Sequence, residues 1–262
     1  TPIRVSIDRF YGIEINDFAV VVARTAMWIA ETSMKRETAS IVHHDLDFFP
    51  LRSEAHIAED NALRIDWRTA CPSPDYLIGN PPFVGARWMS KEQKSDLIGV
   101  FGTNWKNVGD LDYVSCWFKK AADMMKDTSI RSAFVSTNSI AQGESVGVLW
   151  KPLFAEGVHF DFAHLTFRWE SEMADTAHVH CVIIGFSMTP NDVPPRIYIG
   201  KGEYIEVKHI NAYLVEADDV FVESRTKPLC KVPEIGIGNQ PIDDGNYLFE
   251  EAERDAFIKL EP

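Results

Sequence analysis

The stretch "DYLIGNPPFVGARW", residues 75–88, carries an apolar strand directly into an asparagine, two prolines and an aromatic residue. Residues 76–78 have strand character, but Pro81 and Pro82 lack the backbone N–H that a central strand must donate. Proline also restricts the residue before it, so Asn80 is expected in a stiff, extended loop. Because open α/β sheets bind ligands beyond the carboxyl ends of their strands, this loop is a candidate site.

The patterns on both sides of this loop predict alternating strands and helices. The expected parallel strands are residues 9–15, 62–67, 75–80 and 132–139. Helical spacing of apolar residues follows Asp17 and recurs over residues 111–125. Residues 31–60 are polar and interrupted by Pro50, so a long connection with little structure is expected there. This order of elements favours a largely parallel sheet.

The second half of the chain follows a different pattern. A helix over residues 142–156 precedes two strand-like stretches, 160–167 and 177–186, which are joined by a charged loop and favour a terminal antiparallel hairpin. The composition then shifts to Pro and Gly, which predicts a domain boundary between residues 1–188 and 189–262.

The composition limits the class of protein. Lys and Arg total 26 and Asp and Glu total 39, so the formal net charge is −13. This balance disfavours nucleic-acid binding over the whole surface but leaves room for a local basic cleft. The four cysteines are scattered without a C-x-x-C pair, which favours a reduced, cytoplasmic compartment over a zinc site or a disulfide framework. No apolar run is long enough to cross a bilayer, so no membrane partner is expected.

The Asn-Pro-Pro-Phe loop suits transfer of a methyl group to nitrogen. An amino group on a heteroaromatic ring, or an amide nitrogen, is a poor nucleophile because its lone pair is delocalised. The side-chain oxygen of Asn80 and the carbonyl of Pro81 can accept hydrogen bonds from the two N–H groups of such a nitrogen. These hydrogen bonds would localise its lone pair. Phe83 can stack on the ring, and a duplex base must first be flipped out of its stack. The alternative is that these residues form only a turn.

Three motifs in succession resemble those of class I S-adenosylmethionine-dependent amino-methyltransferases. The "NPPF" after an apolar strand resembles their catalytic loop, while "GIEIN" at 12–16 and "RIDW" at 64–67 resemble their cofactor-binding strand ends. The resemblance implies a Rossmann-like fold, mostly parallel with a terminal antiparallel hairpin. It also implies a catalytic group, made of Asn80, Pro81, Pro82 and Phe83.

The same resemblance implies a site for S-adenosylmethionine. Glu14 would hold the ribose hydroxyls, with Ile15 beside it. Asp66 would accept from the adenine amino group, Trp67 would flank the adenine ring, and Asn80 would also border the cofactor. Two of these residues have structural alternatives, since Glu14 would stabilise the N-terminus of a following helix and Asp66 suits a turn.

Longer stretches resemble the MmeI-like DNA adenine methyltransferases of bacterial restriction-modification systems. These stretches are "NALRIDW", "DYLIGNPPFVGARW", "LDYVSCWFKKAA", "FVSTNSIAQGESVGVLW", "FAHLTFRWESEMA" and "GNQPIDDGNYLF". In that family a target-recognition domain follows the catalytic domain and the substrate is double-stranded DNA. Phe167 falls where a second aromatic contacts the flipped base, with Trp169 as the runner-up and a core position as the structural alternative.

One family motif is missing. The glycine-containing turn beneath the methionine part of the cofactor should precede "GIEIN", and only eleven residues stand before Gly12. The chain also begins with Thr1 rather than methionine. The expectation is a sheet truncated at its N-terminus, followed by the start of a target-recognition region, and a fragment that is inactive by itself and binds the cofactor weakly.

The sequence therefore predicts transfer of a methyl group from S-adenosylmethionine to adenine N6 at a specific DNA sequence. Two alternatives stay open: an RNA or protein-glutamine methyltransferase of the same fold, and a non-catalytic DNA-recognition module. His178 and His180 share a strand face, but no third ligand accompanies them, so no metal site is predicted. The recognition sequence, a nuclease on the same chain and the oligomeric state are not predicted.

Overall fold

The structure is a computed structural model, and the residues that it describes are 5–43, 54–169, 179–200, 202–223, 230–232 and 250–260. The chain divides into two compact units, Thr1–Glu223 and Ser224–Pro262. The described helix of the second unit is α7, Glu251–Leu260. Pro50, His178 and the stretch at 238–249 lie outside the described residues, as does the side chain of Trp169.

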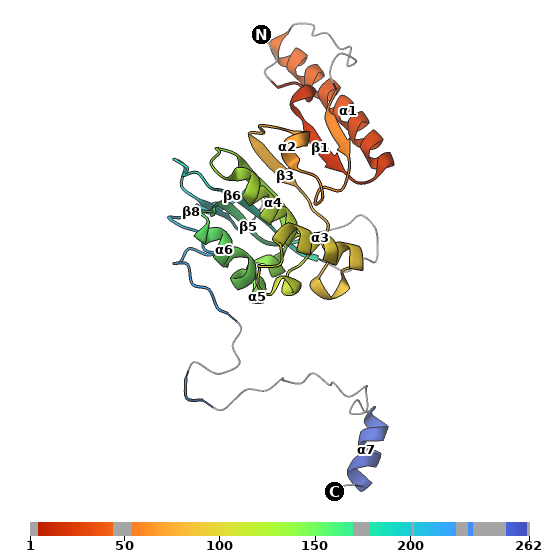
Figure 1. Cartoon of the computed structure of the whole chain (residues 1–262), viewed down its shortest axis with the longest axis vertical. Helices are drawn as coiled ribbons and strands as arrows, with labels where there is room; N and C mark the ends of the chain where they lie inside the picture. Colours follow the sequence, from red (N-terminus) through yellow and green to blue (C-terminus); the bar gives the residue numbers. More distant parts are fainter. Residues whose placement is uncertain are drawn as a thin grey trace. The chain divides into compact units, whose positions relative to one another are not determined.

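The first unit opens with a pair of parallel strands and a long helix (Figure 1). After the short turn η1, Ile7–Arg9, come β1, Tyr11–Glu14, the helix α1, Asp17–Val42, and β2, His56–Glu59. The side chain of Asn16 caps α1 by accepting a hydrogen bond from the Ala19 amide, with 2.9 Å between the two atoms. Both α1 and β2 show that the expectation of a weakly structured connection over 31–60 is wrong. Residues 31–42 are polar but contain neither Gly nor Pro, so nothing interrupts the helix there.

The remaining strands form one six-stranded sheet in the order β3-β4-β6-β5-β7-β8. Their bounds are Tyr76–Gly79 for β3, Arg131–Thr137 for β4, His159–Trp169 for β5, Val179–Ser187 for β6, Arg196–Tyr198 for β7 and Tyr204–Glu206 for β8. The pairs β3/β4 and β5/β7 are parallel, and the other three pairs are antiparallel. The α/β class and the antiparallel pairing of β5 with β6 are confirmed. The expected terminal position of this hairpin is wrong, because β7 pairs with β5 and β8 with β7, so the sheet continues beyond it. The sheet is mixed rather than mostly parallel because β6 runs between β4 and β5 in the opposite direction.

The prediction of a strand over residues 62–67 is wrong. Residues 61–65 form a turn, and Trp67 begins the short helix α2, Trp67–Ala70. The turn forms because the side-chain oxygen of Asn61 accepts from the Leu63 amide at 2.9 Å, while the carbonyl of Asn61 accepts from the Arg64 amide at 2.9 Å. The partner that pairs with β1 is therefore β2, and these two strands form a sheet of their own.

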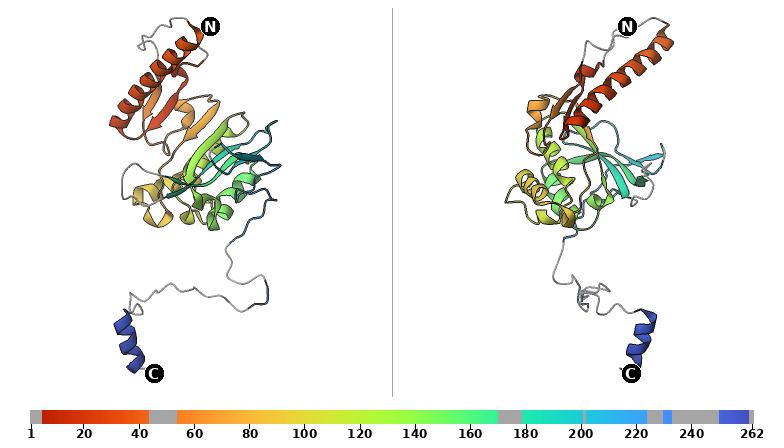
Figure 2. Two further views of the ribbon diagram at one scale, coloured as in Figure 1. Left: turned by 180° about the vertical axis from the view of Figure 1, so that it is seen from behind. Right: turned by 90° about the vertical axis from the view of Figure 1, so that its right-hand side faces the viewer.

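Helices of the middle region lie against the six-stranded sheet (Figure 2). The two longer ones are α3, Lys91–Phe101, and α4, Ser115–Met125. The expected helix over 142–156 is present as α5, Gly143–Ser145, a π-helical segment η6, Val146–Trp150, and α6, Lys151–Ala155. Short turns are η3, Ala86–Trp88, η4, Val108–Asp110, and η5, Asn138–Ala141. The helix α3 was not predicted, although Ser90 and Gln93, which form a capping box, are a sequence signal for its start.

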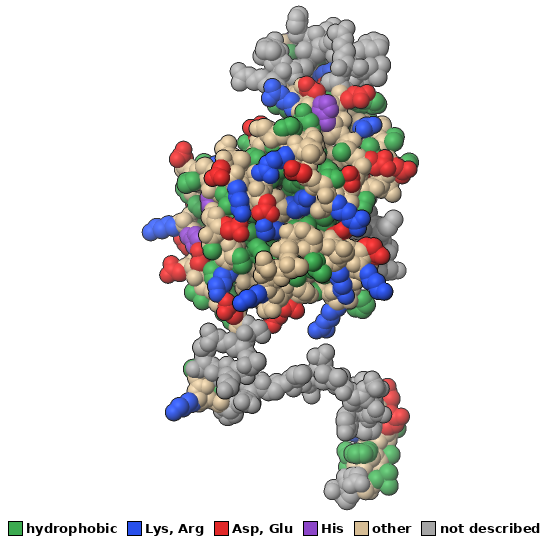
Figure 3. Space-filling model, viewed as in Figure 1, with side chains coloured by type: hydrophobic (Ala, Val, Ile, Leu, Met, Phe, Trp, Pro, Cys, Tyr) green, Lys and Arg blue, Asp and Glu red, His purple; other side chains and the backbone are tan. Residues whose placement is uncertain are grey.

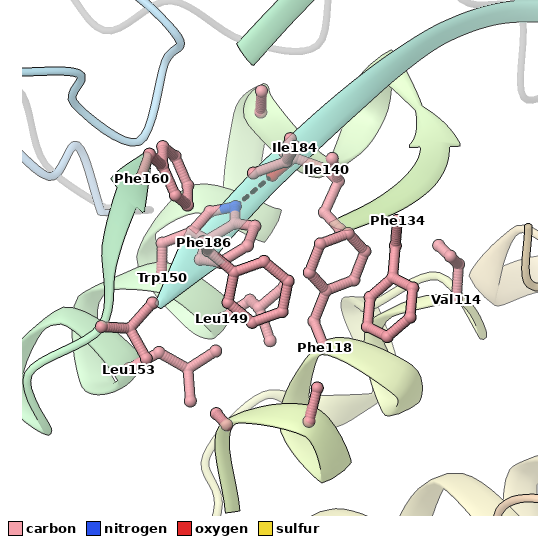
Figure 4. Close-up of a cluster of buried hydrophobic side chains, with 14 of the residues drawn as sticks. Val114, Phe118, Phe134, Ile140, Leu149, Trp150, Leu153, Phe160, Ile184 and Phe186 are labelled. Atoms are coloured by element: carbon pink, nitrogen blue, oxygen red, sulfur yellow. Dashed lines mark hydrogen bonds between the residues drawn. The ribbon is translucent and has the colours of Figure 1, made fainter. Parts of the chain in front are cut away.

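A cluster of aromatic side chains fills the core between these helices and the sheet (Figure 4). Phe118 of α4 contacts Phe134 of β4 and Trp150 edge to face, with 5.3 Å between ring centroids in both pairs. Trp150 is 0% exposed, and its indole N–H donates to the Ile140 carbonyl at 2.8 Å. The core thus joins the helices to β4, whose carboxyl end lies beside the Asn-Pro-Pro-Phe loop.

The surface carries both signs of charge (Figure 3). None of the helices in the described part of the chain combines the length and the apolar composition that a membrane span requires.

Candidate functional site

The Asn-Pro-Pro-Phe loop leaves the sheet at the end of β3. This strand pairs with β4 in parallel, and Gly79 lies opposite Phe134 in the register. Pro81 is buried, and Phe83 is half-buried and packs against the core. Asn80 is exposed, and its side-chain amide makes no hydrogen bond to any residue that the structure describes. The loop is therefore anchored by Pro81 and Phe83 while it leaves a polar amide open to a ligand.

Asp66 stands at the end of the turn that precedes α2. Its exposed carboxylate caps α2 by accepting from the Arg68 amide at 3.0 Å. On the side of the turn that faces α4, the ammonium of Lys120 donates to the Ile65 carbonyl at 2.6 Å. Burial lowers the pKa of Lys120, and the nearby Asp66 carboxylate opposes that change. The turn is thus fixed on its inner side and presents Asp66 outward.

Trp67 lies on the inner side of the same turn. Only 9% of the residue is exposed, and its indole N–H donates to the Ala62 carbonyl at 2.7 Å. The ammonium of Lys120 lies 5.6 Å from the centre of the ring. In this structure Trp67 packs in the core and supports the turn.

A buried carboxylate connects this turn to two helices. Asp96 of α3 is 8% exposed and accepts from Asn61 at 3.1 Å, from the Arg64 guanidinium at 2.7 Å and from the Tyr113 hydroxyl at 3.0 Å. Burial by itself raises the pKa of Asp96, but the hydrogen bonds from its three partners outweigh burial and hold the pKa below its usual range. Asp96 and Lys120 could not be identified from the sequence, because each binds a turn more than thirty residues away.

Glu14 and Ile15 lie at the carboxyl end of β1. The carboxylate of Glu14 is half-buried and accepts from the Asn16 amide at 3.0 Å, so Glu14 does support the start of α1. Ile15 is 68% exposed. Glu14 ends β1, and Asp66 caps α2, a helix that contacts β1.

Phe167 lies near the carboxyl end of β5, in the six-stranded sheet that also contains β3. It faces Cys181 of β6, and Cys181 faces Thr137 of β4 on its other side. The carboxyl ends of β3, β4 and β5 therefore meet at one edge, with β4 and β6 between Phe167 and the loop. At about 4.8 Å per strand, three steps across the sheet separate β3 from β5 by about 14 Å. The Phe167 ring is half-buried and meets His164 edge to face, with 5.0 Å between centroids.

These features define a class of protein. An exposed asparagine amide follows a parallel strand, and two prolines stiffen the loop. The half-buried carboxylate of Glu14 and the exposed carboxylate of Asp66 stand at the end of β1 and at the start of α2. Together with the mixed α/β sheet, this arrangement matches the one that the resemblance to class I methyltransferases implies for a methyltransferase domain.

Comparison with known proteins identifies the family. A family model described as "MmeI, DNA-methyltransferase domain" matches residues 1–198, and one described as "MmeI, target recognition domain" matches residues 216–262. The chain therefore belongs to the MmeI family of DNA methyltransferases, and most of its length lies in the DNA-methyltransferase domain of that family.

Two relatives support this assignment. The chain is 39% identical over 250 residues to "DNA methyltransferase A" of Bacillus subtilis (strain 168), which covers 94% of this chain and 28% of that protein. A solved structure of the Type IIL restriction-modification enzyme MmeI in complex with DNA is 41% identical, with a TM-score of 0.87 over 98% of this chain and 35% of that chain. The chain thus spans about a third of the length of these relatives.

Proposed function

We propose that this chain is the methyl-transfer region of a DNA methyltransferase that acts on the N6 amino group of adenine in a restriction-modification system. The observation that carries the proposal is the loop after β3. It holds Asn80 exposed, with no hydrogen bond from its side chain to the described residues, while Pro81 is buried and Phe83 packs against the core.

The loop residues have distinct roles in the proposed reaction. The side-chain oxygen of Asn80 and the carbonyl of Pro81 accept hydrogen bonds from the two N–H groups of the adenine amino group. These contacts localise the nitrogen lone pair, so they strengthen as positive charge develops on that nitrogen. Phe83 stacks on the flipped base, Pro82 stiffens the turn, and Phe167 is the proposed second aromatic contact.

S-adenosylmethionine is the proposed cofactor, and it would supply an electrophilic methyl group. The residues present fit its nucleoside part. Glu14 offers a carboxylate to the ribose hydroxyls, the exposed side chain of Ile15 offers apolar surface, and Asp66 offers an outward carboxylate to the adenine amino group. Trp67 is proposed to flank the adenine from the turn that it supports.

Double-stranded DNA is the proposed substrate of the whole protein. The family match to a target recognition domain and a 41% identical relative solved with DNA support this proposal. We also propose that residues 1–188 serve methyl transfer and that residues 189–262 form the linker and the beginning of the target-recognition region, although β7 and β8 extend the six-stranded sheet to Glu206.

Substitution of Asn80 tests the proposal directly. In the full-length protein, Asn80→Ala should lower the single-turnover rate of DNA methylation by a factor of about 10² to 10³, the usual effect of losing one preorganised polar contact. Affinity for DNA should change far less, because the contact matters most in the transition state. Measurements at one fixed salt concentration are needed, since phosphate contacts make affinity depend on salt.

Asn104→Ala is the matched control, because Asn104 is also exposed and also lacks a hydrogen bond among the described residues. A folded Asn80→Ala protein that methylates at the wild-type rate would mean that the loop is only a turn. Mass analysis of the product separates N6-methyladenine from methylated RNA or glutamine. Intact DNA binding without binding of S-adenosylmethionine would instead indicate a non-catalytic recognition module.

A further inference from the structure

We propose that Asp112 is a positioning residue for the methyl-transfer site. Its carboxylate holds the segment after Phe83 against the carboxyl end of β4, and so fixes the far end of the Asn-Pro-Pro-Phe loop. This inference rests on the function proposed above for that loop.

The two oxygens of Asp112 bind different parts of the chain. Oδ1 accepts from the backbone N–H of Ala86, with 3.3 Å between the two atoms. Oδ2 accepts from the hydroxyl groups of Thr137, at 3.2 Å, and Ser139, at 2.5 Å. The hydroxyls of Thr137 and Ser139 also lie 2.6 Å apart. One side chain therefore connects the segment after the loop to the carboxyl end of β4 and to the turn η5 that follows it.

The backbone beside Asp112 strengthens this connection. The N–H of Tyr113 donates to the Val84 carbonyl at 2.9 Å. Residues 112 and 113 thus bind both Val84 and Ala86, on either side of Gly85. The Asn-Pro-Pro-Phe loop is consequently fixed at one end by the β3/β4 pairing and at the other end by this pair of contacts.

The chemistry of the site explains why a carboxylate suits this position. Three donors converge on Asp112, and an ionised carboxylate has only acceptors, with room for about four hydrogen bonds. Within the described residues Asp112 forms no ion pair with Lys, Arg or His. The hydrogen bonds of its carboxylate are therefore all to the two segments that it joins, and the residue is half-buried.

Positioning of this kind should affect the reaction rate more than binding. Asn80 and Pro81 must be aimed at two N–H bonds of one base, and a displacement of about 1 Å at a reacting group can cost about a hundredfold in rate. The loop can contact the base whether or not its far end is fixed. Capture of the base should therefore be less sensitive than the reaction rate to the loss of Asp112.

The test uses the full-length protein with Asp112→Ala and Asp112→Asn. Asp112→Ala should lower the single-turnover methylation rate about 10- to 100-fold, with little change in DNA affinity or in the KM for S-adenosylmethionine. Asp112→Asn should keep part of the rate, because its side-chain oxygen can still accept from Ala86 and its amide can donate to Ser139. Asp110→Ala is the matched control, since Asp110 is exposed and its carboxylate has no hydrogen bond among the described residues.

A double variant separates positioning from a general structural effect. If Asp112 acts through the loop, Asp112→Ala should lower the rate of an Asn80→Ala protein much less than it lowers the wild-type rate. An equal loss in both backgrounds, or a wild-type rate in folded Asp112→Ala, would overturn the positioning role. Failure of the proposed function is distinct, because Asn80→Ala alone would then leave the rate unchanged.

Discussion

The carboxylate of Asp96 binds Asn61 and Arg64 of the turn that precedes Asp66, and it also binds Tyr113. Tyr113 is 6% exposed, and its hydroxyl donates to Asp96 at 3.0 Å. Asp96→Ala leaves this buried hydroxyl without its acceptor, so we expect the free energy of unfolding of this chain to fall by about 1–3 kcal/mol. Urea denaturation measures the loss. In a Tyr113→Phe background the same substitution should cost less, and an equal cost would show that the Tyr113 hydroxyl is not the reason.

The contribution of Asp96 should also depend on pH. Its hydrogen bonds hold its folded-state pKa below the usual range, so the unfolded state takes up a proton first as the pH falls. The stabilisation is complete above the unfolded carboxyl pKa of about 3.9 and is lost as the pH falls through the folded value. The difference in unfolding free energy between wild type and Asp96→Ala should therefore be constant from pH 7 to about pH 5 and shrink below about pH 4. A difference that grows in acid would contradict this reasoning.

Phe83 should affect capture of the base as well as its orientation. Stacking of one base on an aromatic ring contributes about 1–3 kcal/mol, so Phe83→Ala should weaken binding and flipping of the target base by a comparable amount. The fluorescence of 2-aminopurine at the target position reports flipping. Phe83→Tyr keeps the ring and is the control. Equal flipping by the Ala and Tyr variants would mean that Phe83 serves only the core that it contacts.

At the scale of elements, the hairpin β5/β6 depends on a close contact between a ring and a strand glycine. A Cβ atom at Gly185 would lie 2.1 Å from Cε1 of Phe162, its neighbour across the pair. Gly185→Ala should therefore destabilise this chain by about 1–3 kcal/mol, the usual cost of overpacking. Calorimetry or urea denaturation measures the effect.

Two comparisons show whether this contact is the cause. Phe162→Ala should relieve much of the loss caused by Gly185→Ala. Gly12 of β1 is the matched strand glycine, because its added Cβ would meet Ile57 at 3.6 Å, an ordinary contact. A loss in Gly12→Ala as large as in Gly185→Ala would point to a general cost of alanine in these strands rather than to the ring.

At the scale of the whole molecule, stability should follow the aromatic core and not the total number of aromatic residues. Trp150 is 0% exposed and contacts Phe118 and Phe160, whereas Trp88, just after the loop, is 86% exposed. Trp150→Ala should lower the unfolding free energy by about 3–5 kcal/mol. Trp88→Ala should change it by less than about 0.5 kcal/mol, as is usual for surface positions. Urea denaturation of both variants tests the contrast, and similar losses would contradict the placement of the core.

Local chemistry was sufficient for the loop and for the strands that surround it. Prolines end β3 wherever it packs, and alternating or continuous apolar runs predicted β4 and the β5/β6 hairpin. The family resemblance was also readable, because its motifs are short and contiguous. These features depend on neighbouring residues alone.

Tertiary structure decided what the sequence pattern could not. The turn at 61–65 resembles a strand in its apolar residues. It is held in another conformation by Asn61, which accepts a hydrogen bond from the Leu63 amide, and by the donors Arg64 and Lys120. Asp112 lies 26 residues from Ala86 and 27 from Ser139, and only folding brings them together. Direction is decided in the same way, because a strand's apolar pattern is the same whichever way it runs. Only pairing in space placed β6 between β4 and β5 and made the sheet mixed.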